Sequence, residues 1–187
     1  MPKIDDARPF IAVRIGVLTV SDTRGQADDR SGDALARMLQ EAGHRLAARS
    51  LVKDEVPAIR AAVESWIADP GIDVVITTGG TGFTGRDVTP EAVRPLFEKE
   101  IDGFAVVFHI ISLQKVGTST IQSRACAGLA RGTYIFCLPG SPGACKDAWD
   151  EILVHQLDYR YQPCNFVEIM PRLDEHLRRP KARTQSG

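Results

Sequence analysis

Residues 79–90 carry the strongest chemical signal in the sequence. The stretch 79–85 reads GGTGFTG, which places four glycines within seven residues, and Asp87 follows it closely. Glycines let backbone N–H groups turn inward and approach a ligand, and such a concave set of amides binds anions. We therefore expect a small molecule that bears phosphate to bind at this loop.

Two known phosphate-binding patterns can be tested against the loop. A Walker loop needs a lysine and then Ser or Thr after its last glycine, whereas Arg86 and Asp87 follow Gly85 here. The stretch 80–85 matches the dinucleotide fingerprint, but Pro90, with Thr89 as the expected cap, starts the helix too late for it. Nicotinamide binding is therefore disfavoured. A glycine-rich turn without a ligand is the remaining alternative, although two glycines would suffice for such a turn.

Two carboxylates are expected beside this loop. Asp87 is available for chemistry because Thr89 is the expected helix cap, and Asp54 follows a predicted strand that ends at the same sheet edge. Two carboxylates repel a phosphate unless a cation intervenes, and Mg²⁺ held by one or two carboxylates plus substrate phosphates resolves that conflict. On the residues alone, a solvated loop charge is the preferred interpretation of Asp54.

Other reactive residue types give weaker signals. Arg124 could bind an anion by charge-assisted hydrogen bonds, although a lone arginine is more often a surface or ion-pair residue. The four histidines have no triad-like context, which disfavours a nucleophilic hydrolase. The four cysteines form no C-x-x-C pair, so reduced thiols in core gaps are preferred to a zinc site.

The elements that must position these residues alternate between strands and helices. Strands are expected at 13–20, 45–52, 73–78, 125–130 and 133–138. Helices are expected from a Ser31 cap to Gly43, at 57–68, after the Thr89 cap, at 104–113, and at 142–157 behind a Ser141 cap. This order predicts an α/β fold of three α/β/α layers with a mostly parallel central sheet. Ligands then lie beyond the carboxyl ends of the strands, where the loops at 21–23, 79–85 and 139–141 are expected to converge.

Length and composition are those of one globular domain. The chain has 187 residues, of which 43% are hydrophobic, and we expect an N-terminal extension at 1–12, a single domain at 13–170 and a polar tail at 171–187. The net charge of −1 argues against nucleic acid or an anionic membrane as a partner. No segment reads as a signal peptide or approaches a membrane span, so a cytoplasmic location is expected.

Several motifs occur in a fixed order along the chain. They are TGGTG at 78–82, RDVTPEA at 86–92, SR at 123–124 and LPGSP at 138–142. Together they resemble the MogA/MoaB family of molybdenum cofactor biosynthesis proteins, to which the gephyrin and plant G domains are related. The resemblance runs from about Val13 to Phe166, and GTST at 117–120 and PCNF at 163–166 are more similar to the MoaB branch.

The resemblance implies adenylyl transfer, in which molybdopterin and ATP, with Mg²⁺, give adenylylated molybdopterin and pyrophosphate. It implies that Asp54 and Asp87 are catalytic and hold the metal. It further implies that substrate or nucleotide is bound by Ser21, Asp22, Gly79, Gly80, Thr81, Gly82, Ser112, Ser123, Arg124, Pro139, Gly140 and Ser141. Ser112 and Ser123 would line the pterin pocket, with Arg124 near its anionic end. A homotrimer or homohexamer is expected, and the alternative function is a MoaB protein that binds molybdopterin without catalysis.

Overall fold

The computed structural model describes residues 1–23, 25–173 and 175, so nearly all of the predicted tail at 171–187 lies outside it. A six-stranded sheet in the order β3-β2-β4-β7-β6-β5 forms its centre. The strands are β2 (Arg14–Val20), β3 (Arg45–Val52), β4 (Val74–Thr78), β5 (Lys99–Glu100), β6 (Cys126–Ala130) and β7 (Thr133–Leu138). The first four in this order are parallel, and β6 and β5 add antiparallel pairings. The predicted mostly parallel sheet is confirmed.

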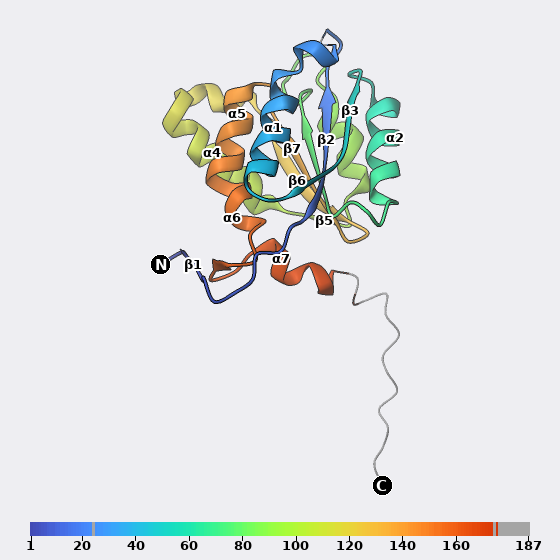
Figure 1. Cartoon of the computed structure of the whole chain (residues 1–187). Helices are drawn as coiled ribbons and strands as arrows, with labels where there is room; N and C mark the ends of the chain where they lie inside the picture. The colour runs from blue at the N-terminus through green and yellow to red at the C-terminus, as the bar shows by residue number, and fades with distance from the viewer. Residues whose placement is uncertain (24, 174, 176–187) are drawn as a thin grey trace.

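Helices cover both faces of this sheet (Figure 1). They are α1 (Arg30–Glu41), α2 (Val56–Ile67), α3 (Thr89–Val93), α4 (Asp102–Val116), α5 (Pro142–Ala148), α6 (Val154–Gln156) and α7 (Phe166–Ile169). A π-helical turn, Trp149–Leu153, joins α5 to α6, and short 3-10 turns lie at Gln26–Asp28, Arg94–Leu96, Gly117–Gln122 and Met170–Arg172. One core cluster contains side chains of α1, α4 and α5, and the other contains those of α2 and α3. The three-layer prediction is therefore confirmed.

The central strands are buried on both faces. Every residue of β4 and β7 is buried, and so is every residue of β2 after Arg14. Parallel strands that helices cover on both sides need nearly continuous apolar runs, and this is why these segments were recognisable in the sequence. Their carboxyl ends form one edge, from which the candidate loops leave.

The start of α1 differs from the sequence prediction. Asp29, not Ser31, caps the helix, because its carboxylate accepts the backbone N–H of Gly32 at 3.0 Å. Ser31 is a buried residue within the first turn. Asp29 also accepts hydrogen bonds from the Thr19 hydroxyl at 2.7 Å and from Arg49 at 2.9 Å. These contacts tie the loop after β2 to the sheet.

The predicted cap of α3 is also wrong. Thr89 is the first residue of that helix, and its hydroxyl donates a hydrogen bond to the carbonyl oxygen of Gly79 at 2.8 Å. Its backbone N–H donates to the carbonyl oxygen of Gly80 at 2.9 Å. Thr89 therefore fastens the glycine loop to the helix. The predicted Ser141 cap of α5 is confirmed, since its hydroxyl accepts the N–H of Ala144 at 3.2 Å.

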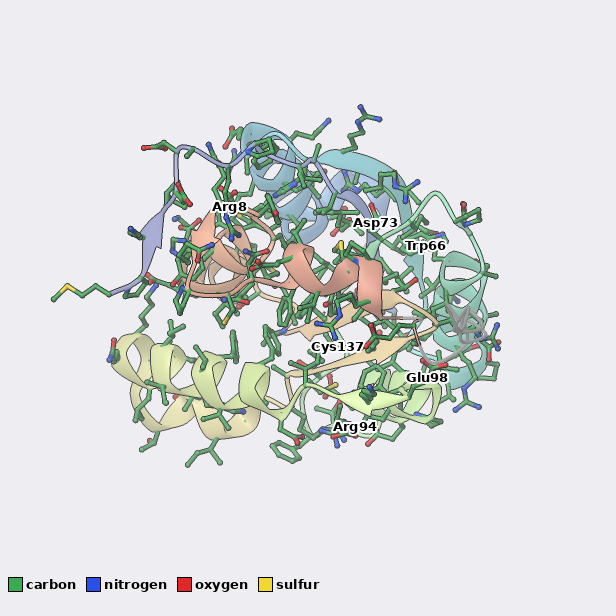
Figure 2. The ribbon with its side chains drawn as sticks, turned by 90° about the horizontal axis from the view of Figure 1, so that it is seen from below. Arg8, Trp66, Asp73, Arg94, Glu98 and Cys137 are labelled. Carbon is green, nitrogen blue, oxygen red and sulfur yellow. The ribbon has the colours of Figure 1, made fainter. Side chains whose placement is uncertain are left out.

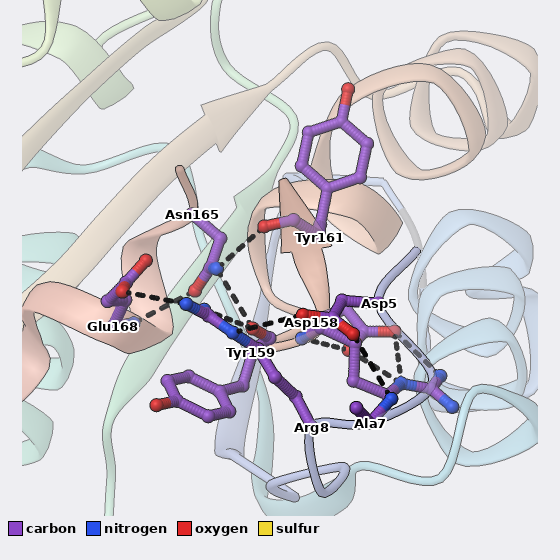
Figure 3. Close-up of polar contacts among 9 residues, drawn as sticks. Asp5, Ala7, Arg8, Asp158, Tyr159, Tyr161, Asn165 and Glu168 are labelled. Atoms are coloured by element: carbon purple, nitrogen blue, oxygen red, sulfur yellow. Dashed lines mark hydrogen bonds and ion pairs between the residues drawn. The ribbon is translucent and has the colours of Figure 1, made fainter. Parts of the chain in front are cut away.

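The end of the molecule opposite these loops holds the N-terminal segment. There β1 (Lys3–Ile4), labelled in Figure 1, pairs antiparallel with β8 (Tyr161–Gln162). Arg8 donates to the carbonyl oxygen of Tyr159 and to the carboxylate of Glu168, both at 3.3 Å (Figure 3). The N-terminal extension is thus held against the last described part of the domain.

Helix α4 has an unusual amount of exposed apolar surface. The stretch Asp102–Gln122 is long and apolar enough to cross a membrane, with a mean hydropathy of 1.3 over 18 residues of which 17% are buried. This corrects the prediction that no segment approaches a membrane span. Length and composition alone are weak evidence for a membrane span. Here Phe104 and Phe108 also anchor the helix in the hydrophobic core. The outer face exposes Ile110 and Leu113, each by more than half.

Candidate functional site

A cavity of about 780 Å³ lies at the carboxyl ends of the central strands. The loops at 21–23, 79–85 and 139–141 converge on it, as the topology predicts. The candidate site residues that line it are Ser21, Asp22, Asp54, Gly79, Gly80, Thr81, Gly82, Asp87, Ser112, Ser123, Pro139, Gly140 and Ser141. Arg124 is the candidate that is not among the lining residues.

Further residues line the cavity that the sequence reasoning did not select. They are Val20, Thr23, Arg86, Phe108, Val116, Ser119, Thr120, Gln122, Gly143, Ala144 and Asp147. Several follow from the length of α4, which continues to Val116 and then into the 3-10 turn Gly117–Gln122. Because the sequence predicts a shorter helix, these neighbours of Ser112 were not placed at the site. The GTST motif at 117–120 was the available signal.

The backbone of the glycine loop explains two of its glycines. Gly79 has φ +107°, and a Cβ there would overlap the carbonyl oxygen of Val20. Gly80 has φ +64°, and a Cβ there would lie 2.9 Å from the carboxylate of Asp54. Positive φ values disfavour other residues. The absence of side chains thus lets Asp54 approach the loop backbone directly.

Asp87 is held inside the curve of the glycine loop. Its carboxylate accepts the N–H of Thr84 at 2.8 Å, the hydroxyl of Thr84 at 2.6 Å and the N–H of Gly82. Partial burial opposes ionisation, but these hydrogen bonds and the charge of Arg124 outweigh it and hold the pKa of Asp87 below its usual value. Two loop amides that were expected to face a ligand phosphate therefore contact Asp87.

Asp54 lies near two other negative charges. Burial raises the pKa of Asp54 first, and the charges of Asp22 and Asp87 raise it further. The backbone N–H of Asp54 donates to Asp22 at 3.2 Å, so the loops after β2 and β3 are joined here. The structure therefore brings Asp54 and Asp87 together at one rim. Their mutual repulsion is of the kind that a cation relieves.

The donor set of this rim fits a magnesium ion that arrives with phosphate. Within the described residues, no group of three His, Cys, Asp or Glu side chains is arranged to hold a metal. Mg²⁺ usually keeps several waters and takes only one or two carboxylates plus substrate phosphates. Asp54 and Asp87 match this requirement, whereas a permanently bound structural metal would need more ligands.

Arg124 contacts the glycine loop but does not line the cavity. Its guanidinium donates to the carbonyl oxygens of Gly82 at 2.8 Å and Asp87 at 2.7 Å, and it forms an ion pair with Glu91. Its backbone N–H donates to the carbonyl oxygen of Thr81 at 2.8 Å. Contact between Arg124 and a ligand stays a prediction, and the observed contacts are those of a residue that positions the loop.

A second arginine lies on the cavity itself. Arg86 donates two hydrogen bonds to the carboxylate of Asp22, from Nε at 2.7 Å and from Nη2 at 2.9 Å. This contact lowers the pKa of Asp22. The paired residues come from different loops, and together they border the part of the cavity that contains Asp54.

Helix α4 contributes apolar side chains to the cavity. Phe108 and Val116 of α4 line it together with the hydroxyl groups of Ser112, Ser119 and Ser123. An apolar wall with a few polar groups is typical of sites for small organic ligands. The cavity therefore combines the charged residues beside the glycine loop with apolar side chains of α4, and Asp147, which is paired with Lys115 of α4, also lines it.

Known proteins match this chain along most of its length. Residues 16–159 match the family model described as a probable molybdopterin binding domain. Molybdenum cofactor biosynthesis protein B of Escherichia coli (strain K12) is 52% identical over 157 residues, which cover 84% of this chain and 92% of that protein. The protein of the same name from Bacillus subtilis (strain 168) is 44% identical over 146 residues, with 78% and 86% covered.

Solved structures agree with the fold. A crystal structure of molybdenum cofactor biosynthesis protein B has a TM-score of 0.81 and 37% identity, and the match covers 90% of this chain and 99% of that one. The tungsten cofactor synthesizing protein MoaB from Pyrococcus furiosus has a TM-score of 0.66 and 38% identity, with 76% and 91% covered. A MogA structure has a TM-score of 0.68 and 31% identity, with 77% and 97% covered.

Proposed function

The chain belongs to the MogA/MoaB family of probable molybdopterin binding domains, and from this premise we propose that it acts in molybdenum cofactor biosynthesis. The resemblance predicted from its sequence motifs is thereby confirmed. The proposed reaction is Mg²⁺-dependent transfer of AMP from ATP to molybdopterin. A phosphate oxygen of molybdopterin attacks the α-phosphorus of ATP, the bond from that phosphorus to the bridging oxygen breaks, and pyrophosphate leaves.

The observation that carries this proposal is the pair of carboxylates at the rim of the phosphate loop. Thr84 and Gly82 fix Asp87 in one orientation, and Asp54 contacts the loop where Gly80 lacks a side chain. Both carboxylates would hold Mg²⁺, which when bound supplies positive charge against the phosphates. Phosphoryl-type transfer depends mainly on positioning and charge neutralisation, so no protein nucleophile is needed.

The apolar side chains that α4 contributes to the cavity support the choice of acceptor. Phe108 and Val116 offer contacts to a planar pterin, while Ser112 and Ser123 offer hydroxyl groups to its polar edge. A pterin bound there could place its phosphate at the glycine loop, because residues of α4 and of the loop line one continuous cavity. The same cavity thus suits both substrates of the transfer.

The test is incubation of the purified chain with molybdopterin, ATP and Mg²⁺, followed by detection of pyrophosphate. We expect release from the wild type and a loss on the order of 100-fold in Asp87→Asn and in Asp54→Asn, as for removal of one electrostatic catalytic group. Asp102→Asn, an exposed aspartate at the start of α4, is the matched control and should behave as the wild type. Molybdopterin binding without any pyrophosphate would favour the alternative, a non-catalytic MoaB protein.

We further propose a cytoplasmic homotrimer or homohexamer. The exposed apolar side chains of α4, among them Val106, Ile110 and Leu113, support an interface between subunits. Figure 2 shows α4 along one side of the molecule with a row of side chains directed away from the sheet. The four cysteines form no disulfide, and Cys164 is exposed, which suits a reducing compartment.

A further inference from the structure

The charge balance of the cavity is unusual for a site that binds polyphosphate. Four carboxylates line it, those of Asp22, Asp54, Asp87 and Asp147. Arg86 is the one arginine or lysine in the described lining. A bound nucleotide adds several negative charges to this surface, so a cation at the right place has a large effect on its affinity.

Several of the other expected donors already have partners. The guanidinium of Arg124 contacts carbonyl oxygens and Glu91 behind the loop. The amides of Gly82 and Thr84 donate to Asp87. The amide of Gly79 donates to the carbonyl oxygen of Leu138 at 3.0 Å. The glycine loop therefore offers a phosphate fewer donors than its sequence suggests.

Arg86 has a partner, Asp22, that a phosphate can replace. Its ion pair with Asp22 is solvent-exposed, with 58% of the Arg86 side chain and 31% of the Asp22 side chain accessible. Such exposed pairs contribute little to stability. The planar guanidinium binds a phosphate with the same two-pronged geometry that it uses for a carboxylate. A phosphate can thus replace Asp22 without leaving a buried charge unpaired.

We propose that Arg86 is the residue that binds the polyphosphate of the nucleotide, and that Asp22 holds its guanidinium until the phosphate displaces it. This inference rests on the proposed function, because it takes ATP as the ligand. It assigns the cationic role of the site to Arg86 and leaves Arg124 as a positioning residue. Once Asp22 is released from Arg86, its carboxylate and that of Asp54 would together attract the cation that accompanies the phosphates.

The two halves of the ion pair allow a sharp test, because the proposal predicts opposite effects. Binding is measured by calorimetry with inorganic pyrophosphate alone and with ATP plus Mg²⁺. We expect Arg86→Gln to weaken both affinities about 10- to 100-fold, as for loss of a hydrogen-bonded charge. Asp22→Asn retains the oxygen that accepts the N–H of Asp54, but it removes the competing charge, so pyrophosphate binding should tighten several-fold.

Two controls accompany these variants. Arg37→Gln removes the same charge at an exposed position of α1, and it should leave both affinities unchanged. Arg86→Lys should bind with intermediate affinity, because an ammonium group keeps the charge but not the two-pronged geometry. Thermal unfolding of each variant should lie within about 2 °C of the wild type, since the ion pair is exposed.

The outcomes separate this inference from the proposed function. Equal weakening by Arg86→Gln and Asp22→Asn would show that the ion pair only supports the loops, and it would overturn the proposal. Unchanged affinity in Arg86→Gln, or a wild type that binds neither probe, would also overturn it. If the wild type binds pyrophosphate through Arg86 but forms no adenylylated product, the proposed transfer fails while this inference holds.

Discussion

Replacing Arg124 by methionine tests whether this residue positions the glycine loop or binds substrate. Methionine keeps the length and packing of the side chain but removes the donors to Gly82 and Asp87. Each hydrogen bond from a charged donor is worth about 1.5–3 kcal/mol, and 26% exposure of the side chain reduces the sum because water replaces part of it. We therefore expect a loss of about 2–3 kcal/mol in the free energy of unfolding. For a domain of this size, that lowers Tm by about 4–12 °C.

The assay is thermal unfolding followed by circular dichroism, together with calorimetry of molybdopterin binding. Arg60→Met is the matched control, since Arg60 also donates to backbone carbonyl oxygens, those of Glu91 and Ala92, but at 3.3 and 3.2 Å and outside the glycine loop. It should lose no more than about 1 kcal/mol. If Arg124→Met kept the wild-type Tm and lost only molybdopterin affinity, the sequence-based role of Arg124 would be right and the positioning role wrong.

Three further variants test other features of the structure. The pKa of Asp54 is raised on folding, so the folded chain loses stability as the pH rises through that raised pKa. Asp54→Asn should therefore raise Tm at pH 7 and have no effect near pH 3. A lower Tm at pH 7 would refute this. Burial lowers the pKa of His44, so stability should fall as the pH drops below about 6.5, and His44→Gln should flatten the stability curve between pH 7 and 5; an unchanged slope would contradict this cause. Ile110→Glu should reduce the oligomeric mass in light scattering without altering the circular dichroism spectrum, and an unchanged mass would exclude this face of α4 as the interface.

The sheet was predictable because its strands carry local signals. The strands at 45–52 and 133–138 were predicted with the observed bounds. The second is a continuous apolar run, as expected of a buried strand, whereas the first is an edge strand in which exposed and half-buried residues alternate over much of its length. Caps were less predictable, because several polar residues compete within one turn. Asp29 replaced Ser31 at the start of α1 since Thr19 and Arg49, which are distant in sequence, fix its carboxylate there.

The site was predictable as a set of loops but not as a network of contacts. The order of strands and loops predicted that Asp54 and Asp87 lie at the same sheet edge, and both line the cavity there. Nothing local in the sequence distinguishes Arg86 from Arg124 as the residue that faces the cavity. That difference depends on Glu91 and the loop carbonyl oxygens, which draw Arg124 to the far side of the loop.

The small sheet formed by β1 and β8 bears on how the protein can be handled or joined to others. It places the N-terminus and the last described helical turn at the end of the molecule away from the carboxyl edge of the central strands (Figure 1). An affinity tag, a fluorescent reporter or a tether to a solid support attached beside β1 would therefore leave the mouth of the cavity open to solvent. Deleting the first eight residues, in contrast, would remove Arg8 and expose the carbonyl and carboxylate groups that it contacts on Tyr159 and Glu168.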